Sequence, residues 1–443
     1  MYDANKYPAS HALYAEAKQY LPGGNTRTTV FEKPFPLYAS HGKGCHVWDV
    51  DGNRRIDCIN NYTAMIHGHA HPGIHQAVLR QMEQGTCFGM PTESEILLAK
   101  ELVSRLDSVE TVRFTNSGTE AVMMAIKAAR AYTGRPKIAK VEGAYHGSYD
   151  PAEISLDPGP QHWGDKTPNP VPYAKGTPAS IVDGVIVLPF NDPQKARELI
   201  ALHGKDLAAI LIDPLPNRAG LIPASEAFLR AIREAADAVG ALVIFDEVIS
   251  FRLSHGGAQG LFSISPDLTT LGKVIGGGFP VGAVGGRRDV MAVFDPSSGK
   301  PALPHGGTFS ANPITMRAGL AALEFLDEPA FAHLAKIGDQ VRKAANESLA
   351  RHGVPGIVVG MGSLLKIHFT DRQPTDYRAV YPTPVEAAKL RLFNQTLIGN
   401  GILPSGYGLM ALSTPMTADD VQQIDSAVDI AIRAVRDMEP SHA

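Results

Sequence analysis

Cysteine is scarce in this sequence. The 443 residues include three cysteines, Cys45, Cys58 and Cys87, and no two of them form a Cys-x-x-Cys pair. Their spacing provides no disulfide framework, which fits a protein of the reducing cytoplasm. Long apolar runs are absent too, because no segment approaches about 18 uninterrupted apolar residues and the first residues contain no apolar signal-peptide core. We therefore expect a cytoplasmic protein without a membrane span.

The sequence also lacks a large excess of charge of either sign. Its formal net charge is −4 and it contains no run of basic residues, so we expect no nucleic-acid partner. Hydrophobic residues make up 44% and charged residues 19% of the chain, which is typical of a globular protein. A chain of 443 residues exceeds the usual size of one domain and favours two or three subdomains.

Short apolar runs alternate with helical stretches between residues 75 and 326. This alternation predicts an α/β fold with a mostly parallel sheet that helices cover on both faces. Residues 151–178 contain seven prolines and predict a long irregular excursion, of a length that is usually functional or disordered. The apolar runs are TVRFTN (111–116), KIAKVEG (137–143), LAAILIDPL (207–215) and ALVIFDEV (241–248).

The pattern changes toward both ends of the chain. Residues 45–58, CHVWDVDGNRRIDC, predict a hairpin that turns at Asp51-Gly52. Beyond Asp327 the sequence predicts a long helix, two apolar runs, a helix near 384–399 and a last helix from about 418. We predict that residues 75–326 form a large domain, and that residues 1–74 and 327–443 together form a smaller α+β domain.

Asp246 and Lys273 are the first candidate functional residues. Asp246 ends the apolar run ALVIFD, where a buried carboxylate is costly unless a cation or several donors lie nearby. This position is the carboxyl end of a predicted strand, where ligands bind in open α/β sheets. Lys273 follows another short apolar run and precedes three glycines, Gly276 to Gly278. A structural ion pair between Asp246 and Lys273 is the alternative interpretation.

Two further stretches complete a pattern. Ser117-Gly118-Thr119 stands at the start of a predicted helix, where free N–H groups, hydroxyls and the helix dipole suit a phosphate; simple N-capping is the alternative. Tyr145 follows another strand end and is a candidate to stack on a flat ligand, although a lone aromatic is more often part of the core. A phosphate anchor, a carboxylate, an aromatic ring and an imine-forming lysine together suit pyridoxal 5′-phosphate (PLP).

Four stretches of this sequence resemble class III, subgroup II, aminotransferases, which are PLP-dependent transferases of fold type I. The resemblance implies a mostly parallel central sheet with a smaller α+β domain built from both termini. It also implies a homodimer with shared active sites, a small-molecule amino donor and a keto-acid acceptor. The similarity extends from LPGGN to the last helix and rests on NSGTEAVMMAIKAARAYTGRPKI, EGAYHG, IFDEV and PDLTTLGKVIGGGFPVGAVGG.

The resemblance implies a role for individual residues. Lys273 matches the lysine that forms a Schiff base with PLP, Asp246 the partner of the pyridine nitrogen, and Val248 the residue packed behind the ring. Asp213 stands where the family usually has a glutamate, which has a longer side chain. The remaining cofactor-binding matches are Ser117, Gly118 and Thr119 of the phosphate loop, Tyr145 on the ring face with His146 beside it, and Thr308, which reaches the phosphate from the neighbouring subunit.

Two groups of relatives compete within this family. One is glutamate-1-semialdehyde 2,1-aminomutase, which moves an amino group within one molecule, and the other is the β-amino-acid aminotransferases, such as the β-phenylalanine type. Arg27 matches an arginine of the β-type enzymes, whereas the aminomutase has its arginine where this chain has Thr29. Both positions point the same way in an extended segment, so Arg27 is a candidate to bind a carboxylate, with a surface arginine as the alternative.

The stretch PSGYGLMALS, residues 404–413, bears on the same choice. The aminomutase resembles PSxFE here, and this chain has Gly408 in place of the glutamate. The β-phenylalanine type has an arginine at the position of Tyr407, so neither pattern is complete. Arg218 stands where the aminomutase has asparagine and is a second candidate carboxylate clamp, with an exposed loop arginine as the alternative. We expect intermolecular transamination by a ping-pong mechanism, with intramolecular amino transfer as the alternative.

A rival interpretation rests on HGHAHPGIH, which places histidines at positions 67, 69, 71 and 75. Alternating histidines are candidate ligands of a divalent metal, which would make the protein a metalloenzyme or a metal carrier. No carboxylate or cysteine cluster completes this site in the sequence, and Pro72-Gly73 interrupts any regular helix that would present it. GHxHP is also common in the resembling family, where it is structural. We therefore expect no bound metal.

Overall fold

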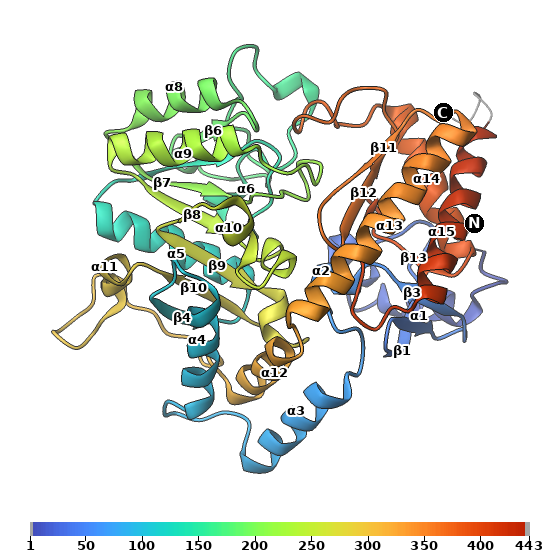
Figure 1. The fold of residues 1–443 in the computed structure, drawn as a ribbon, viewed down its shortest axis with the longest axis horizontal. Coiled ribbons are helices and arrows are strands. Elements are labelled where there is room, and N and C mark those ends of the chain that lie inside the picture. The colour runs from blue at the N-terminus through green and yellow to red at the C-terminus, as the bar shows by residue number, and fades with distance from the viewer. Residues whose placement is uncertain (1–2, 439–443) are drawn as a thin grey trace. The chain divides into compact units, whose positions relative to one another are not determined.

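The computed structural model describes residues 3–438, which form two compact units (Figure 1). The larger unit contains residues 73–331 and 373–380, and the smaller unit contains the remaining described residues. Within residues 3–438, no helix has both the length and the apolar character that a bilayer crossing requires.

The larger unit alternates strands with helices along most of its length, as its sequence predicts. Short 3-10 turns lie at Pro160–His162, Ser250–Leu253, Lys273–Gly276 and Ala292–Phe294. Its strands are β4 (Thr111–Thr115), β5 (Lys137–Val141), β6 (Val185–Leu188), β7 (Leu207–Ile212), β8 (Leu242–Asp246), β9 (Leu268–Gly272) and β10 (Gly282–Gly286). Its helices are α3 (Pro72–Gln84), α4 (Glu93–Arg105), α5 (Gly118–Thr133), α6 (Asp150–Glu153), α7 (Ala179–Val182), α8 (Pro193–His203), α9 (Glu226–Val239), α10 (Gly257–Phe262), α11 (Arg288–Met291) and α12 (Pro313–Glu324).

A seven-stranded sheet forms the centre of the larger unit, in the order β4-β10-β9-β8-β7-β5-β6. Neighbours from β9 through β6 run parallel, and β10 is antiparallel to both β9 and β4. The prediction of a mostly parallel sheet is confirmed. Because the five parallel strands end at one edge, the loops that follow them meet there.

Helices bury both faces of this sheet. Successive strand residues point to opposite faces, so Leu211 packs in the layer that includes Ile126 of α5, while its neighbour Ile210 packs with Phe228 of α9. Helices α8 and α9 pack side by side on the second face (Figure 1). This double cover explains why the strands read as continuous apolar runs rather than as alternating patterns.

The proline-rich excursion is largely irregular, as predicted. Beyond the short helix α6 it contains the 3-10 turn Pro160–His162, and the short helix α7 begins directly after it. Ser155 ties it together, because its hydroxyl donates to the carbonyl of Asn169 and accepts from the N–H of Val171, at 2.7 and 2.9 Å. The excursion is therefore an ordered part of the larger unit.

The smaller unit is an α+β structure built from both ends of the chain. It contains one sheet in the order β1-β2-β3-β13 and another in the order β11-β12-β14. Strands β2 and β3 form the predicted hairpin, and 3-10 turns lie at Pro22–Gly24 and Thr28–Val30. Its strands are β1 (Ala39–Lys43), β2 (His46–Asp49), β3 (Arg54–Asp57), β11 (Ile357–Val359), β12 (Leu364–His368), β13 (Ile402–Leu403) and β14 (Leu409–Ala411). Its helices are α1 (Pro8–Ala17), α2 (Asn60–Thr63), α13 (Glu328–His352), α14 (Pro384–Gly399) and α15 (Ala418–Arg436).

The sequence periodicity of the last helix predicts which of its residues are buried. Helix α15 begins at a capping box formed by Thr417 and Asp420 and buries one apolar stripe. The five residues predicted to form this stripe are all buried: Val421, Ile424, Val428, Ala431 and Val435.

One part of the predicted domain organisation is wrong. We placed residues 327–443 together in the small domain, but residues 373–380 pack with the larger unit. Val380 joins the apolar layer of α8 and α9, and the side chain of Asn191 donates to the carbonyl of Thr375 at 3.2 Å. These contacts are between residues far apart in sequence, so no local pattern predicts them.

Candidate functional site

Asp246 is the last residue of β8 and lies buried at the carboxyl edge of the parallel strands. One carboxylate oxygen accepts from the hydroxyl of Thr270 at 3.0 Å and from the N–H of Val248 at 3.1 Å. The other oxygen lies 2.7 Å from Nδ1 of His146. Among the described residues, the ionisable partner of Asp246 is thus His146, and a direct ion pair with Lys273 is not formed.

His146 is buried beside this carboxylate. Burial lowers the pKa of His146, although the hydrogen bond and charge of Asp246 oppose the shift, so the ring is neutral near pH 7. Because a carboxylate only accepts, we assign the ring proton to Nδ1, which donates to Asp246. The other ring nitrogen, Nε2, is buried and has no hydrogen-bond partner among the described residues. A buried polar atom of this kind is normally satisfied by a ligand or an ordered water.

Lys273 directly follows β9 and occupies a strained backbone position. Its φ is +49°, in the left-handed region, which costs a non-glycine residue about 1–3 kcal/mol and is concentrated at functional sites. Burial lowers the pKa of Lys273, while the charges of Asp246 and Asp213 oppose the shift. A lysine whose pKa is lowered supplies more of the neutral amine, which is the nucleophilic form.

Asp213 directly follows β7 and lies buried next to the same charges. Its Oδ1 accepts from the N–H of Leu215 at 2.8 Å. Burial, and then the charge of Asp246, raise the pKa of Asp213 well above its ordinary value. The neutral form of Asp213 is therefore favoured, because a second negative charge would be buried beside Asp246.

The start of α5 lies against the loop that carries Tyr145. Ser117 caps the helix, because its Oγ accepts from the N–H of Glu120 at 3.1 Å. The capping interpretation of Ser117 is thus confirmed, but a helix start has four free N–H groups, and one cap satisfies one of them. Thr119 Oγ1 accepts from the N–H of Ser148 at 3.3 Å, which joins the helix start to the loop.

Gly118 and Val248 are in direct contact. A Cβ built on Gly118 would lie 3.0 and 3.1 Å from the two methyl carbons of Val248, closer than side chains normally pack. A Cβ on Gly272, next to Lys273, would lie 3.3 Å from the same valine. The structure therefore brings together the segments around residues 118, 248 and 273, which are far apart in sequence.

The whole chain resembles proteins of known type. It matches the family model of class-III aminotransferases over residues 28–435. This chain belongs to the class-III aminotransferase family. It is 39% identical over 431 residues to a glutamate-1-semialdehyde 2,1-aminomutase of Desulforudis audaxviator, with 96% of this chain and 97% of that protein covered.

Solved structures of class-III enzymes superpose closely on this one. An omega-transaminase from Sphaerobacter thermophilus has a TM-score of 0.95 and 50% identity, with 98% of this chain and 100% of that chain covered. A β-phenylalanine aminotransferase from Variovorax paradoxus has a TM-score of 0.87 and 37% identity, with 96% and 94% covered. The fold is therefore that of the type I PLP-dependent transferases.

PLP is the cofactor of this family, and the cluster around Asp246 fits it. The start of α5 suits the phosphate, the carboxylate of Asp246 suits the ring nitrogen, and the Lys273 amine suits the aldehyde. Tyr145 is 44% exposed, so part of this residue is accessible to a ligand. The unpartnered Nε2 of His146 is a polar atom that such a ligand, or a water beside it, would satisfy.

Thr308 is exposed on the irregular segment before α12. Its neighbour Gly307 faces Ser310, whose hydroxyl is 3.4 Å from the Asn116 side chain. The contact of Thr308 with a neighbouring subunit's phosphate stays a prediction.

Two candidate substrate residues, Arg27 and Tyr407, lie in the smaller unit. Arg27 is exposed, and its Nη1 donates to Oδ1 of Asn61 at 2.8 Å. Tyr407 stacks on Tyr62 with ring centroids 6.2 Å apart, and Nζ of Lys366 lies 5.3 Å from the centroid of its ring. Asn61 and Tyr62 both have positive φ, at 46° and 55°, so this pair of contacts is built on strained backbone.

The third candidate, Arg218, lies in the larger unit. Its guanidinium is 3.4 Å from a carboxylate oxygen of Asp157, at the start of the proline-rich excursion, and both side chains are partly exposed. Such a partly exposed pair contributes little to stability, and the binding of a substrate carboxylate by Arg218 stays a prediction.

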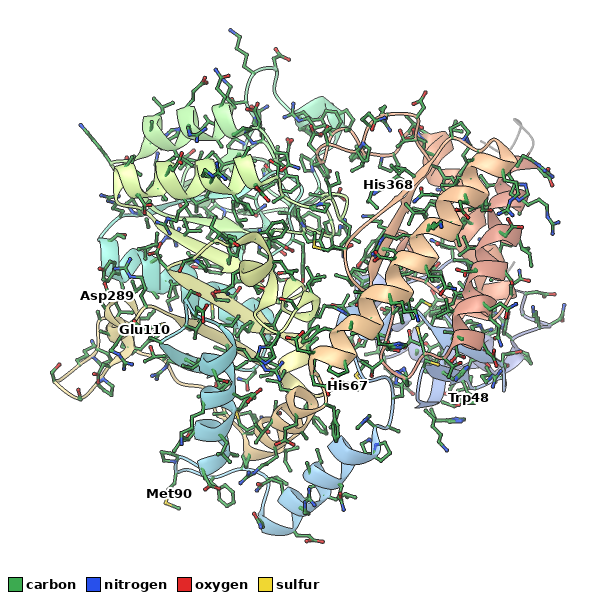
Figure 2. All side chains as sticks on the ribbon, viewed as in Figure 1. Trp48, His67, Met90, Glu110, Asp289 and His368 are labelled. Carbon is green, nitrogen blue, oxygen red and sulfur yellow. The ribbon has the colours of Figure 1, made fainter. Side chains whose placement is uncertain are left out.

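The metal interpretation of the histidines at positions 67 to 75 gains no support. Among residues 3–438, one group of three side chains has ligand atoms close enough for a metal, and it does not include these histidines. His69 instead lies 2.7 Å from Asp57, and His67 (labelled in Figure 2) lies 3.0 Å from the Thr414 hydroxyl, both in the smaller unit.

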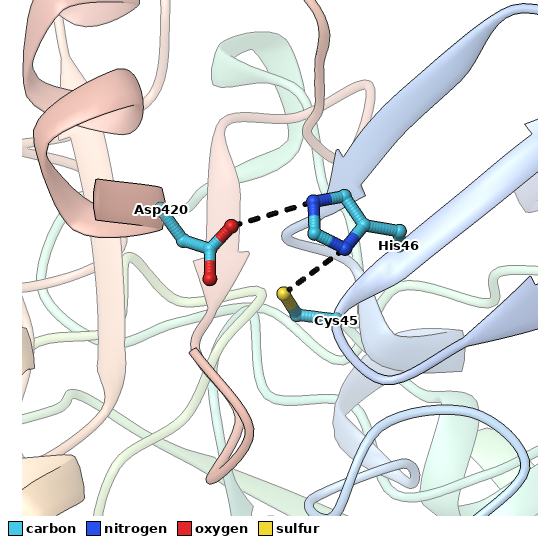
Figure 3. Close-up of side chains that lie close together, drawn as sticks. All are labelled: Cys45, His46 and Asp420. Carbon is cyan, nitrogen blue, oxygen red and sulfur yellow. Dashed lines mark hydrogen bonds and ion pairs between the residues drawn. The ribbon is translucent and has the colours of Figure 1, made fainter. Parts of the chain in front are cut away.

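The group that does converge consists of Cys45, His46 and Asp420 (Figure 3). The Cys45 sulfur faces Nδ1 of His46 at 3.5 Å, and Asp420 faces Nε2 at 3.3 Å, so the two ring nitrogens point to different partners. Burial, and then the charge of Asp420, raise the pKa of Cys45 to about 12, so the side chain is a thiol near neutral pH in the metal-free protein. The group is best described as a hydrogen-bonded chain that joins β2 to α15.

Sequence reasoning missed two residues that shape the site. Thr270 hydrogen-bonds Asp246 from inside β9, and the signal was available, because LTTLG places two hydroxyls in a strand that is otherwise apolar. Lys140 is fully buried at the end of β5, and its ammonium lies within 3.2 Å of three backbone carbonyls. A lysine inside an apolar run was the corresponding signal for this second residue.

Proposed function

We propose that this enzyme transfers an amino group from an amino acid, with β-amino acids among the candidate donors, to a keto acid in a ping-pong reaction in the cytoplasm. The donor and acceptor bind in turn, and pyruvate and 2-oxoglutarate are the candidate acceptors. Similarity to an omega-transaminase at 50% identity and to a β-phenylalanine aminotransferase at 37% supports this proposal.

The conformation of Gly408 is the observation that carries the choice of intermolecular transfer. The aminomutase pattern has a glutamate at this position, and Gly408 has a φ of +82°. A Cβ here would lie 3.1 Å from a methyl of Leu390 and 3.2 Å from the carbonyl oxygen of Ile367. A glutamate would therefore meet both backbone strain and close contacts, so this backbone is not shaped to present the aminomutase carboxylate.

Intramolecular amino transfer is the second candidate function. It is supported by the 39% identity to a curated glutamate-1-semialdehyde 2,1-aminomutase over nearly the whole chain. The two reactions use the same cofactor and lysine, so the cluster around Asp246 does not separate them. They differ in one requirement, because only intermolecular transfer needs a keto acid from outside.

Each residue of the cluster has a proposed task. Bound PLP supplies an electron sink that stabilises negative charge on the substrate carbon. Lys273 holds the cofactor, and its amine then accepts the proton from the substrate carbon that carries the amino group. Asp246 would stabilise a positive ring nitrogen of the bound cofactor; two opposite charges about 4 Å apart in an effective dielectric near 20 attract each other by roughly 4 kcal/mol. Val248 supports the ring from one side.

The remaining residues bind and orient. Tyr145, with His146 beside it, faces the ring; Arg27, Arg218 and Tyr407 are proposed to bind substrate carboxylate or side-chain groups. The raised pKa of Asp213 favours its neutral form, which limits the negative charge beside Asp246. The phosphate is proposed to bind Ser117, Gly118 and Thr119, with Thr308 from a second subunit.

A homodimer accounts for an apolar surface of the larger unit. A cavity of about 830 Å³ lies between α4, the edge strand β4 and residues 305–311. Exposed apolar side chains line or flank these elements, including Ile96, Phe309 and Met90, the last labelled in Figure 2. An edge strand beside exposed apolar side chains suits a second copy of the chain, which would also place Thr308 in an interface.

The experiment that tests the proposed function is a donor screen. Purified enzyme with PLP is offered α- and β-amino acids with pyruvate or 2-oxoglutarate, and glutamate-1-semialdehyde is tested beside them without an acceptor. We expect turnover of at least one donor only when a keto acid is present. Turnover of the semialdehyde with no added acceptor would overturn the choice in favour of the aminomutase reaction.

A further inference from the structure

A short segment from the C-terminal part of the chain, called here the strap, packs with the larger unit. The strap is residues 373–380, which pack with the larger unit although the residues before and after them belong to the smaller unit. It lies against the loop of residues 142–148, called here the 142–148 loop, which carries Tyr145 and His146. Nothing in the proposed chemistry uses the strap directly.

Tyr377 of the strap packs onto the backbone of this loop. The tyrosine is buried, and a Cβ built on Gly143 would lie 2.1 Å from its ring, so the ring lies directly over that glycine. Its hydroxyl is 3.0 Å from both a carboxylate oxygen of Asp157 and the carbonyl of Pro158. Tyr377 therefore contacts the loop and the proline-rich excursion at the same time.

Arg378 forms an ion pair with Glu142, the first residue of the same loop. Its Nε and Nη2 donate to the two carboxylate oxygens of Glu142, at 2.7 and 3.0 Å, in a two-pronged contact that fixes orientation as well as distance. The guanidinium also donates to the carbonyls of Trp163 and Gly164, at 2.5 and 3.1 Å. Glu142 is buried, so Arg378 is the cation that makes its charge tolerable there.

The end of the loop that Tyr377 and Arg378 contact leads directly into the candidate site. Glu142 and Gly143 lead directly into Tyr145, the proposed ring-facing residue, and His146, which hydrogen-bonds Asp246. Lys140 also contacts this loop, because its amine donates to the carbonyl of Ala144 at 3.0 Å. A shift at residues 142 and 143 would therefore act on Tyr145 and His146 through the short stretch of backbone between them.

We propose that the strap is a positioning element, in which Tyr377 and Arg378 set the place of the 142–148 loop and thereby of Tyr145 and His146 against PLP. The inference rests on the proposed function for the identity of the cofactor and of these two residues' task. It assigns no chemistry to the strap, because the described hydrogen bonds of Tyr377 and Arg378 go to Glu142 and to the proline-rich excursion.

The test removes the two-pronged contact and follows the loop rather than activity alone. In the Arg378→Met holoenzyme we expect faster hydrogen exchange of the peptide that covers residues 142–148 and an altered visible absorption of the bound cofactor. We also expect kcat to fall on the order of 10²-fold with a much smaller change in KM, since a misplacement of about 1 Å has an effect of that size. Unchanged exchange and absorption would overturn the proposal.

A matched control is Arg197→Met. Arg197 also pairs with a glutamate, Glu234, at 2.7 Å, and this pair joins α8 to α9 of the larger unit, outside the strap and the 142–148 loop. We expect this variant to keep the exchange of the loop and the absorption of the cofactor as in the parent enzyme. Equal effects of the two variants would show a general loss of stability and would contradict a positioning role.

A double variant separates position from buried charge. Arg378→Met alone leaves Glu142 buried without its cation, whereas Glu142→Gln with Arg378→Met removes both charges and keeps the test usable if the single variant folds poorly. We expect the double variant to recover thermal stability but not loop protection or cofactor absorption; recovery of all three overturns the proposal. Exchange and absorption need no turnover, so they test the strap even if no donor and acceptor pair is found.

Discussion

Replacing Gly118 by alanine tests the contact that joins the phosphate loop to the residue behind the ring. The new Cβ would lie 3.0 and 3.1 Å from the methyl carbons of Val248. Carbon atoms pack best at about 3.5–4.0 Å, so the overlap is roughly 0.5 Å or more against each of the two methyls. Overpacking of this kind costs about 1–3 kcal/mol.

An opposing effect acts at the same position. Gly118 is the first residue of α5, and alanine is favoured over glycine in a helix by about 0.5–1 kcal/mol. The clash outweighs this gain, so we expect Gly118→Ala to lower the free energy of unfolding by about 0.5–2 kcal/mol. We also expect weaker PLP binding, because the clash lies at the proposed phosphate loop.

The assay is urea unfolding of the PLP-free protein, with PLP affinity measured separately so that ligand binding does not mask the change in stability. The matched variants are Val248→Ala and the double variant. Val248→Ala alone removes two methyls and should cost at most about 1.5 kcal/mol. In the double variant the clash is absent, so the two effects should fail to add by about 1–3 kcal/mol. Strict additivity, or a Gly118→Ala variant as stable as the parent, would refute the packing argument.

Four further outcomes are expected. Lys273→Ala should release PLP on dialysis. It should also lower kcat on the order of 10²–10⁴-fold or more, because a general base supplies an acceleration of that size. An unchanged rate with retained colour would contradict the assignment. Thr270→Val, nearly the same in shape, should cost about 1.5–3 kcal/mol in urea unfolding, because it removes a hydrogen bond to the buried Asp246 carboxylate. Burial raises the pKa of Cys45 from 9.0 to about 12, so the stability that its protonated form contributes is present below pH 9 and is lost as the pH rises toward 12. Cys45→Ser should remove this part of the alkaline loss of stability in a pH series of thermal unfolding. Identical curves for the variant and the parent would contradict the prediction. Gly408→Glu should lower stability by more than about 1 kcal/mol, because φ is +82° there, and should not create turnover of glutamate-1-semialdehyde without an acceptor; the reverse result would revive the aminomutase interpretation.

Local signals located most of the structural elements. The continuous apolar runs at residues 111–116, 207–215 and 241–248 predicted buried strands, and these strands are present. Ser117 at the start of α5 and Asp51-Gly52 at the turn of the hairpin are also local signals, because they mark where an element begins or turns. Such signals work because capping, turning and side-chain alternation depend on residues a few positions apart.

The partners of the site residues were harder to predict. The buried carboxylate of Asp246 indicated that a cation or several donors must lie nearby, and an ion pair with Lys273 was the alternative interpretation. The structure supplies His146 and Thr270 instead. Which donors reach a carboxylate depends on which strand ends lie side by side, and the order β9-β8-β7-β5 is not encoded in any short stretch.

The sequence by itself determined the alternation of strands and helices, the helix starts, and the motif residues Lys273, Asp246 and Ser117 to Thr119, because each depends on chemistry among close neighbours in the chain. Only the tertiary structure decided that Gly118 touches Val248, that His146 holds Asp246, and that residues 373–380 pack with the larger unit. Those contacts join segments separated by about a hundred residues or more, and burial of apolar surface, which has no preferred direction along the chain, selects them.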